Sequence, residues 1–126
     1  MRPMRTARGK REAVVVVEDN AELAALLTDE LTDAGCAVTA TGSAVGAAAL
    51  VRQVRPRAVV LDLGLPYRSG AKLLDEIKGD PRTAPVPVVV VSAYAGELSR
   101  NRAGLAAAII PKPFLLHTLL AALQSA

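Results

Sequence analysis

The sequence predicts a single α/β domain with a doubly wound (βα)5 fold, in which five parallel strands form a sheet with helices on both faces. Three observations support this fold class. Short apolar runs alternate with longer segments that carry apolar residues at helical spacing. The apolar runs have no polar alternation, as expected of strands covered on both faces. The length of 126 residues suits one compact core and is too short for two ordinary domains.

The strands are predicted at five apolar runs. They are residues 13–17, 36–40, 58–61, 86–91 and 106–110. Valine fills most of the first and fourth runs, and its branched side chain suits the pleated surface of a sheet. Residues 106–108 are all alanine, so this part of the last run fits a helix as well as a strand.

The first two helices are predicted from apolar stripes and from residues that start or stop helices. Asn20 is expected to cap the first helix and Gly35 to end it. The stripe of this helix has the spacing i, i+3, i+4, i+8 and consists of Leu23, Leu26, Leu27 and Leu31. Ser43 is expected to open the second helix and Pro56 to stop it. The inward residues of the second helix are Ala47, Ala48, Val51 and Val54.

The last three helices differ in the strength of their patterns. The third has Leu73, Leu74 and Ile77 inward and is expected to end at Gly79. The fourth, at residues 97–103, is weakly patterned and lies between two glycines, so we expect a short helix there. The last helix has a strong apolar stripe that consists of Leu115, Leu116, Leu119, Leu120 and Leu123.

Composition excludes several classes of protein. Hydrophobic residues make up 52% of the chain and charged residues 21%, a balance that excludes intrinsic disorder over most of the length. No apolar stretch approaches the roughly 20 residues that span a bilayer, and the N-terminus lacks the apolar core of a secretory signal. The single cysteine, Cys36, excludes an internal disulfide and a cysteine-based zinc site. We therefore expect a cytoplasmic protein.

Residues 1–11 form a basic segment that we expect to be a disordered arm, with the folded domain at residues 12–126. The segment carries five Arg and Lys residues and no acid, whereas the rest of the chain has 10 bases and 12 acids. The simplest interpretation is a solvated arm, and the alternative is contact with the phosphates of a nucleic acid. Tyr67, Tyr94 and Phe114 are the only aromatic residues, so the chain has no platform for stacking bases.

Polar side chains directly follow four of the predicted strands. Glu18 and Asp19 follow the first, Asp62 the third, Ser92 the fourth and Lys112 the fifth. Because ligands bind beyond the carboxyl ends of the strands in open α/β sheets, we expect these side chains to converge at one edge. Repulsion among three carboxylates raises their pKa values, and a divalent cation would offset it. Hard oxygen donors with room for water and phosphate favour Mg²⁺. An alternative for the first acid pair alone is that it complements a helix N-terminus.

Four motifs around these residues resemble the receiver domain of two-component response regulators, the CheY-like family. The motifs are VVVVEDN at residues 14–20, VVLDLGLPYRSG at 59–70, VVVVSA at 88–93 and PKPF at 111–114. Each motif is weak alone, but four in the family's order, each at a strand end, form a specific combination. The resemblance covers residues 12–126 and implies the flavodoxin-like strand order 2-1-3-4-5.

The resemblance implies a role for each residue at the strand ends. Asp62 is the expected nucleophile, which accepts a phosphoryl group from a histidine kinase or phosphotransfer protein, or from a small donor such as acetyl phosphate. Ser92 and Lys112 are expected to bind phosphoryl oxygens. The expected Mg²⁺ ligands are Glu18, Asp19, Asp62 and the backbone carbonyl of Gly64. By the same resemblance, Pro113 is a candidate for a cis peptide bond.

The resemblance also implies a signalling switch rather than a metabolic enzyme, with only its own phosphorylation and dephosphorylation catalysed. The new phosphoryl charge is expected to change the surface formed by the fourth helix, the fifth strand and the last helix. That surface would dock a downstream protein target or support a homodimer. We expect no membrane partner, and nucleic acid only through the basic arm or through an output domain outside this sequence.

The sequence departs from the family at the switch. Ile109 stands where the family has an aromatic switch residue, and Tyr94 is the nearest candidate to replace it. Gly64 offers no side chain to orient a hydrolytic water, so we expect slow self-dephosphorylation. The stretch from Ser92 to Lys112 is about two residues shorter than is usual in the family, which again predicts a short fourth helix.

Two further functions stay open at this point. One is a receiver-like interaction module that works independently of phosphorylation, which the missing switch aromatic favours. The other is a small phosphatase with an aspartyl nucleophile. Against the phosphatase stand Gly64, where a second acid would be needed, and the absence of a cap insertion.

Overall fold

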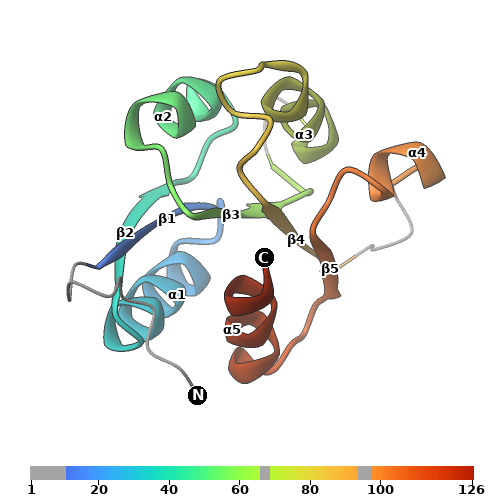
Figure 1. Ribbon diagram of the computed structural model, residues 1–126. Helices are drawn as coiled ribbons and strands as arrows, with labels where there is room; N and C mark the ends of the chain where they lie inside the picture. The colour runs from blue at the N-terminus through green and yellow to red at the C-terminus, as the bar shows by residue number, and fades with distance from the viewer. Residues whose placement is uncertain (1–10, 66–68, 94–97) are drawn as a thin grey trace.

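The computed structural model describes residues 11–65, 69–93 and 98–126. The sheet consists of five parallel strands in the order β2-β1-β3-β4-β5 (Figure 1). The strands are β1 (Glu12–Val17), β2 (Cys36–Thr41), β3 (Ala58–Asp62), β4 (Val88–Ser92) and β5 (Ala108–Pro111). The helices are α1 (Ala21–Asp33), α2 (Ala47–Val54), α3 (Gly70–Gly79), α4 (Arg100–Ala103) and α5 (Leu116–Ser125). The predicted fold class and strand order are confirmed. In the described part of the chain, no helix is both long and apolar enough to cross a membrane.

Two apolar layers cover the sheet, one on each face. Successive side chains of a strand point to opposite faces, so Val14 and Val16 pack on one side of β1 and Val15 and Val17 on the other. Helices α1 and α5 bury the first layer, which includes Leu27, Leu119 and Leu123. Helices α2 and α3 bury the second layer. Because both faces are covered, β3 and β4 are buried along their whole length.

The ends of α1 are those predicted. The Asn20 side chain accepts a hydrogen bond from the Leu23 amide at 3.0 Å, and Gly35 follows the helix at φ 102°. An L-residue with a side chain rarely adopts such a positive φ, so glycine is suited to this position.

The predicted start of α2 is wrong. The helix begins at Ala47 rather than at Ser43, whose side chain accepts from the Val45 amide within a turn. Gly46 then takes a left-handed conformation at φ 79°, which separates this turn from the helix. The C-terminal end agrees with the expectation, because Arg55 leaves the helical region directly before Pro56.

Two leucines of the predicted stripes are exposed instead of buried. Leu26 of α1 is 54% exposed, and Leu115, which precedes the first residue of α5, is 65% exposed. In the rest of the α5 stripe, Leu119, Leu120 and Leu123 are buried and Leu116 is half-buried. Helix α4 is a single turn of four residues, in line with the predicted short helix.

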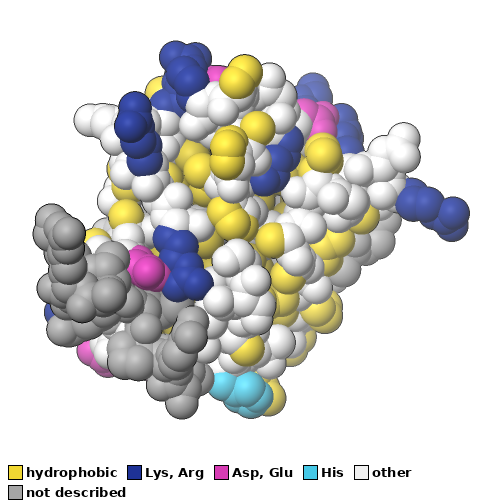
Figure 2. Space-filling view, in the orientation of Figure 1, with side chains coloured by type: hydrophobic (Ala, Val, Ile, Leu, Met, Phe, Trp, Pro, Cys, Tyr) yellow, Lys and Arg dark blue, Asp and Glu magenta, His cyan; other side chains and the backbone are white. Residues whose placement is uncertain are grey.

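Basic side chains gather over α2 and α3 on the face shown in Figure 2. Among them, Asp80 lies 3.0 Å from a guanidinium nitrogen of Arg82 and 3.5 Å from one of Arg52. The hydrogen bond from Arg82 holds the Asp80 pKa below its ordinary value. One carboxylate thus partly balances two arginines between the end of α2 and the loop after α3.

A second ion pair joins the beginning of β1 to the segment before β3. Arg57 pairs with Glu12 and also donates to the backbone carbonyl of Gln124 at 3.0 Å, near the end of α5. All of these groups lie at the N-terminal edge of the parallel sheet, so the polar residues that follow the strands lie at the opposite edge.

Candidate functional site

The structure brings the polar residues at the strand ends together. Glu18 directly follows β1, and Asp62 is the last residue of the neighbouring strand β3. Carboxylate oxygens of Glu18, Asp19 and Asp62 all lie within 4.8 Å of one another. Glu18 and Asp62 are only 2% and 6% exposed, whereas Asp19 is exposed. The cluster is therefore a half-buried acidic site open to solvent on the side of Asp19.

The backbone around Glu18 fixes this side chain in the cluster. The Glu18 amide donates to the Thr41 carbonyl at 3.0 Å, which continues the pairing of β1 with β2. The Asn20 amide donates to Glu18 Oε2 at 3.2 Å. The contact from Asn20 was not predicted, and the sequence holds no specific signal for it.

Lys112 reaches the acidic cluster from the end of β5. Its Nζ lies 2.8 Å from Glu18 Oε1 and 3.5 Å from Asp62 Oδ2. The Lys112 amide donates to the Ser92 carbonyl at 2.8 Å, which ties the lysine to the end of β4. The Lys112–Pro113 peptide bond is cis.

Glu18 and Lys112 influence each other's pKa values. Burial raises the pKa of Glu18, the hydrogen bond from Lys112 opposes this shift, and the neighbouring Asp62 adds to it. Burial alone would lower the pKa of Lys112, but its hydrogen bond to Glu18 and the charge of Asp62 raise it. The lysine therefore stays charged, and the site carries a negative charge in excess.

The donors fit a hard divalent cation. Three carboxylates and one ammonium leave two negative charges in excess, which one divalent cation would balance. The carboxylate oxygens are hard donors, and the exposed side at Asp19 leaves room for water. This combination suits Mg²⁺, which keeps several waters when proteins bind it.

Asp62 is held by the segment that follows it. The Gly64 amide donates to Asp62 Oδ1 at 3.1 Å, and the Gly70 amide donates to the Leu63 carbonyl at 3.0 Å. A Cβ atom on Gly70 would lie 2.6 Å from Leu63 Cα and would overlap the Asp62 carbonyl oxygen. Glycine at the start of α3 thus allows this helix to pack directly against the end of β3. This close approach was missed, because a sequence gives no distance between backbones.

The remaining predicted residues lie around the cluster. Ser92 is 2% exposed at the end of β4, next to Pro111 of β5. Ile109 is partly buried in β5 and packs against the core on the side of α2 and α3. The Gly64 carbonyl ligand stays a prediction. Tyr94 lies outside the described residues.

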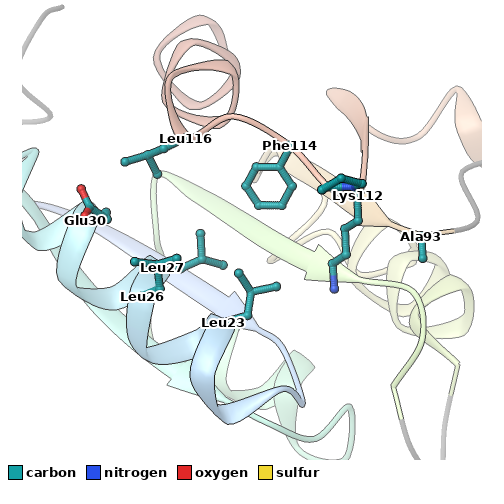
Figure 3. A pocket seen from close by; sticks show the side chains of 9 residues that line it. Leu23, Leu26, Leu27, Glu30, Ala93, Lys112, Phe114 and Leu116 are labelled. Atoms are coloured by element: carbon teal, nitrogen blue, oxygen red, sulfur yellow. The ribbon is translucent and has the colours of Figure 1, made fainter.

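An apolar pocket of about 540 Å³ lies beside the lysine, between α1 and the segment that joins β5 to α5 (Figure 3). Phe114 and Leu116 line it from one side, and Leu23, Leu26 and Leu27 line it from α1. The sequence predicted the four leucines as core residues rather than as the lining of a pocket, because periodicity alone does not tell how far two helices stand apart.

Comparisons with known proteins agree with this geometry. The model of the response regulator receiver domain family matches residues 14–124. The polar-differentiation response regulator DivK from Brucella anthropi is 30% identical over 116 residues, which cover 90% of this chain and 94% of DivK. A solved sensor protein from Polaromonas sp. JS666 is 32% identical with a TM-score of 0.85, over 92% of this chain and 95% of that chain.

A third similar structure is the receiver domain of a sensor histidine kinase from Pseudomonas aeruginosa PAO1, which has a magnesium ion coordinated in its active site cleft. It is 24% identical with a TM-score of 0.82, over 91% of this chain and 96% of that chain. At this identity the similarity establishes the shared fold.

Proposed function

The chain belongs to the response regulator receiver domain family of two-component systems, and on this basis we propose that Asp62 accepts a phosphoryl group from a phosphohistidine of a kinase or phosphotransfer protein. The phosphorylated domain then regulates a downstream protein. The observation that carries the proposal is the position of Lys112 Nζ between Glu18 and Asp62 at the carboxyl ends of the strands.

The transfer exchanges one bond to phosphorus for another. An oxygen of the Asp62 carboxylate bonds to phosphorus while the phosphorus–nitrogen bond of the donor breaks, and its electron pair goes to the histidine nitrogen. The transition state is loose, so the protein contributes position and charge neutralisation. The Gly64 amide orients the nucleophile through Asp62 Oδ1, and Lys112 supplies a compact positive charge next to Asp62 Oδ2.

The acidic cluster supplies the metal site in this proposal. Glu18, Asp19 and Asp62 would hold Mg²⁺, which when bound neutralises charge on the phosphoryl oxygens. The assignment of Mg²⁺ depends on the donor chemistry and the excess negative charge. Without phosphate, Lys112 neutralises part of the negative charge of the cluster by pairing with the buried Glu18.

The product changes the balance of charge at the site. The aspartyl phosphate carries about −1.5 to −2 charges and strong acceptor oxygens, in place of the single negative charge of the Asp62 carboxylate. Within the described residues, the side chains of Ser92, at the end of β4, and Lys112, directly after β5, are the ones we assign to these oxygens. A contact that pulls on these strands moves the surface of α4, β5 and α5, where we place the docking of the downstream target. The domain acts as a switch, with no chemistry beyond its own phosphorylation and dephosphorylation.

A second candidate is an interaction module that does not respond to phosphate. It is favoured by Ile109 in place of an aromatic switch residue and by the single turn of α4. In this case the acidic site would be retained without controlling the docking surface.

Treatment with acetyl phosphate separates the two candidates. We expect the full chain to gain the mass of one phosphoryl group in the presence of Mg²⁺. We expect no gain in mass when a chelator is present, and none in Asp62→Asn. Asp75→Asn, an acid outside the site, is the matched control and should incorporate phosphate normally. Incorporation without a change in the NMR shifts of α4, β5 and α5 would favour the interaction module. Equal incorporation in Asp62→Asn would disprove the assigned nucleophile.

A further inference from the structure

The C-terminal half of α1 concentrates negative charge. Asp29, Glu30 and Asp33 lie in its last five residues, and the last turn contains no basic residue. The C-terminus of a helix is also the negative end of its dipole, where acids are unfavourable and cations are stabilising. This end of α1 therefore attracts a cation from elsewhere.

The described residues do not supply that cation. Across residues 11–65, 69–93 and 98–126, none of Asp29, Glu30 and Asp33 forms an ion pair. The acids are not needed for the metal site either, because they lie toward the other end of the helix from Glu18 and Asp19.

The apolar pocket continues this acidic surface. Glu30 lines the pocket together with Leu23, Leu26 and Leu27, and Leu26 is 54% exposed. Leu26, Glu30 and Asp33 follow one another at i, i+4 and i+7, so they share one face of α1. Figure 3 shows Leu26, Leu27 and Glu30 along the helix, with Phe114 and Leu116 across the pocket. A segment that binds this surface needs positive charges for the acids of α1 and an apolar side chain for the pocket.

The N-terminal segment of this chain has that composition. Residues 1–10 contain Arg2, Arg5, Arg8 and Lys10, no acid, and two methionines, Met1 and Met4. Methionine is flexible and fills irregular apolar pockets well.

The segment also joins the folded domain close to the acidic end of α1. Glu12 pairs with Cys36, so Arg11 lies next to Gly35, two residues after the end of α1. Ten extended residues span about 33 Å, whereas the 13 residues of α1 span about 20 Å. For the segment to run along α1, the chain would have to reverse direction before β1, and the sequence offers a glycine, Gly9, for this reversal.

We propose that residues 1–10 bind along α1 of the same molecule, with their Arg and Lys side chains against Asp29, Glu30 and Asp33 and a methionine in the apolar pocket. Bound in this way, the segment covers the pocket beside Lys112. Binding of this segment along α1 does not require phosphoryl transfer at Asp62.

A spin label in the segment tests this directly. In Thr6→Cys the new thiol is labelled with a nitroxide, while the native Cys36 is buried and unreactive by its position in the core. We expect the label to broaden the amide NMR signals of Leu23, Leu27 and Phe114 several-fold more than those of Val51 and Ile77 on the opposite face. Broadening restricted to the neighbours of Arg11 would overturn the proposal.

Charge and apolar contact are tested separately. The triple variant Asp29→Asn, Glu30→Gln, Asp33→Asn removes the acids, and about 1 M salt shortens the Debye length to about 3 Å. The triple variant and the high salt are each expected to reduce the broadening of the α1 signals. The double variant Met1→Ser, Met4→Ser is expected to reduce the broadening of the Phe114 signal. Glu76→Gln, on the other face of the sheet, is the control and should leave the broadening of the α1 signals unchanged. Broadening that survives both the triple variant and salt would disprove the electrostatic part.

A mixture of two labelled samples shows whether the segment binds its own chain or a second copy. Isotope-labelled protein without the nitroxide is combined with spin-labelled protein without isotopes. We expect no broadening of α1 in this mixture, because the segment binds its own chain. Broadening that grows with concentration would show binding to a second copy and would overturn the intramolecular proposal.

Discussion

Lys112 is held more closely by Glu18 than by Asp62. Its Nζ lies 2.8 Å from Glu18 Oε1 and 3.5 Å from Asp62 Oδ2. Since the Glu18 side chain is only 1% exposed, the lysine is the cation that makes its burial tolerable. The lysine that is assigned to phosphate in the proposed mechanism therefore also has a structural role before phosphate arrives.

Replacement of this lysine tests that role. Lys112→Met retains the apolar stem and leaves Glu18 buried without its counter-charge. Loss of one partner of a buried pair costs about 3–5 kcal/mol, and we expect the lower end because the Lys112 side chain is 22% exposed. Urea denaturation without metal measures the loss. Lys72→Met, on the exposed side of α3, is the control, and equal stability of the two variants would contradict the assigned role.

Gly70→Ala is expected to disturb both stability and the nucleophile. A Cβ atom would lie 2.6 Å from Leu63 Cα and against the Asp62 carbonyl oxygen, so α3 or the end of β3 must shift. Overpacking of this kind costs about 1–3 kcal/mol. We also expect slower incorporation of phosphate from acetyl phosphate.

Gly79→Ala is the matched control for this substitution. Gly79 lies at the other end of α3, and an added Cβ meets no atom within 4 Å. Alanine favours a helix over glycine, so we expect this variant to be as stable as the parent or slightly more stable. If both alanine variants behaved alike in denaturation, the close approach at Gly70 would have no energetic consequence.

The Asp80 pair predicts a pH dependence. The side-chain hydrogen bond from Arg82 lowers the pKa of Asp80 from its ordinary value of 3.8. A lowered carboxyl pKa contributes stability that is present above the ordinary value and is lost as the pH falls through the folded value. Asp80→Asn should therefore be less stable than the parent near neutral pH, and the two should converge below pH 3.8. A difference that stays constant over this range in thermal unfolding would refute the contribution.

The lifetime of the aspartyl phosphate is a further prediction. Gly64 offers no side chain to orient a hydrolytic water, and Tyr94 is the candidate that shields the phosphoryl group. We expect slow decay in Mg²⁺ and faster decay in Tyr94→Glu, because a carboxylate can orient water for attack. Decay is followed by phosphorus NMR or by intact mass. A Tyr94→Glu variant no faster than the parent would remove the basis of the hypothesis.

The sequence predicted the positions of the chemistry better than the ends of the helices. Apolar strands without polar alternation are expected in a parallel sheet that helices cover on both faces. In such a sheet the polar residues that directly follow the strands lie at the same edge. This logic is sufficient to place Glu18, Asp62 and Lys112 together, as the structure does.

The errors have local causes. Ser43 has the side chain of a helix cap but bonds within a turn, because its conformation depends on Gly46 three residues later. Leu26 has the spacing of a core residue, but it lines the open apolar pocket beside α1 and stays 54% exposed. Periodicity reports the face on which a residue lies, but it does not report the distance to whatever lies opposite.

Arg57 connects residues from the beginning and the end of the folded unit, through Glu12 and the Gln124 carbonyl. A short linker between these two points would close the backbone into a ring. New termini opened in an exposed loop elsewhere would then leave all neighbouring strands in their present pairs. The domain is thus a good scaffold for circular permutation, and a sensor built in this way would keep its acidic edge accessible.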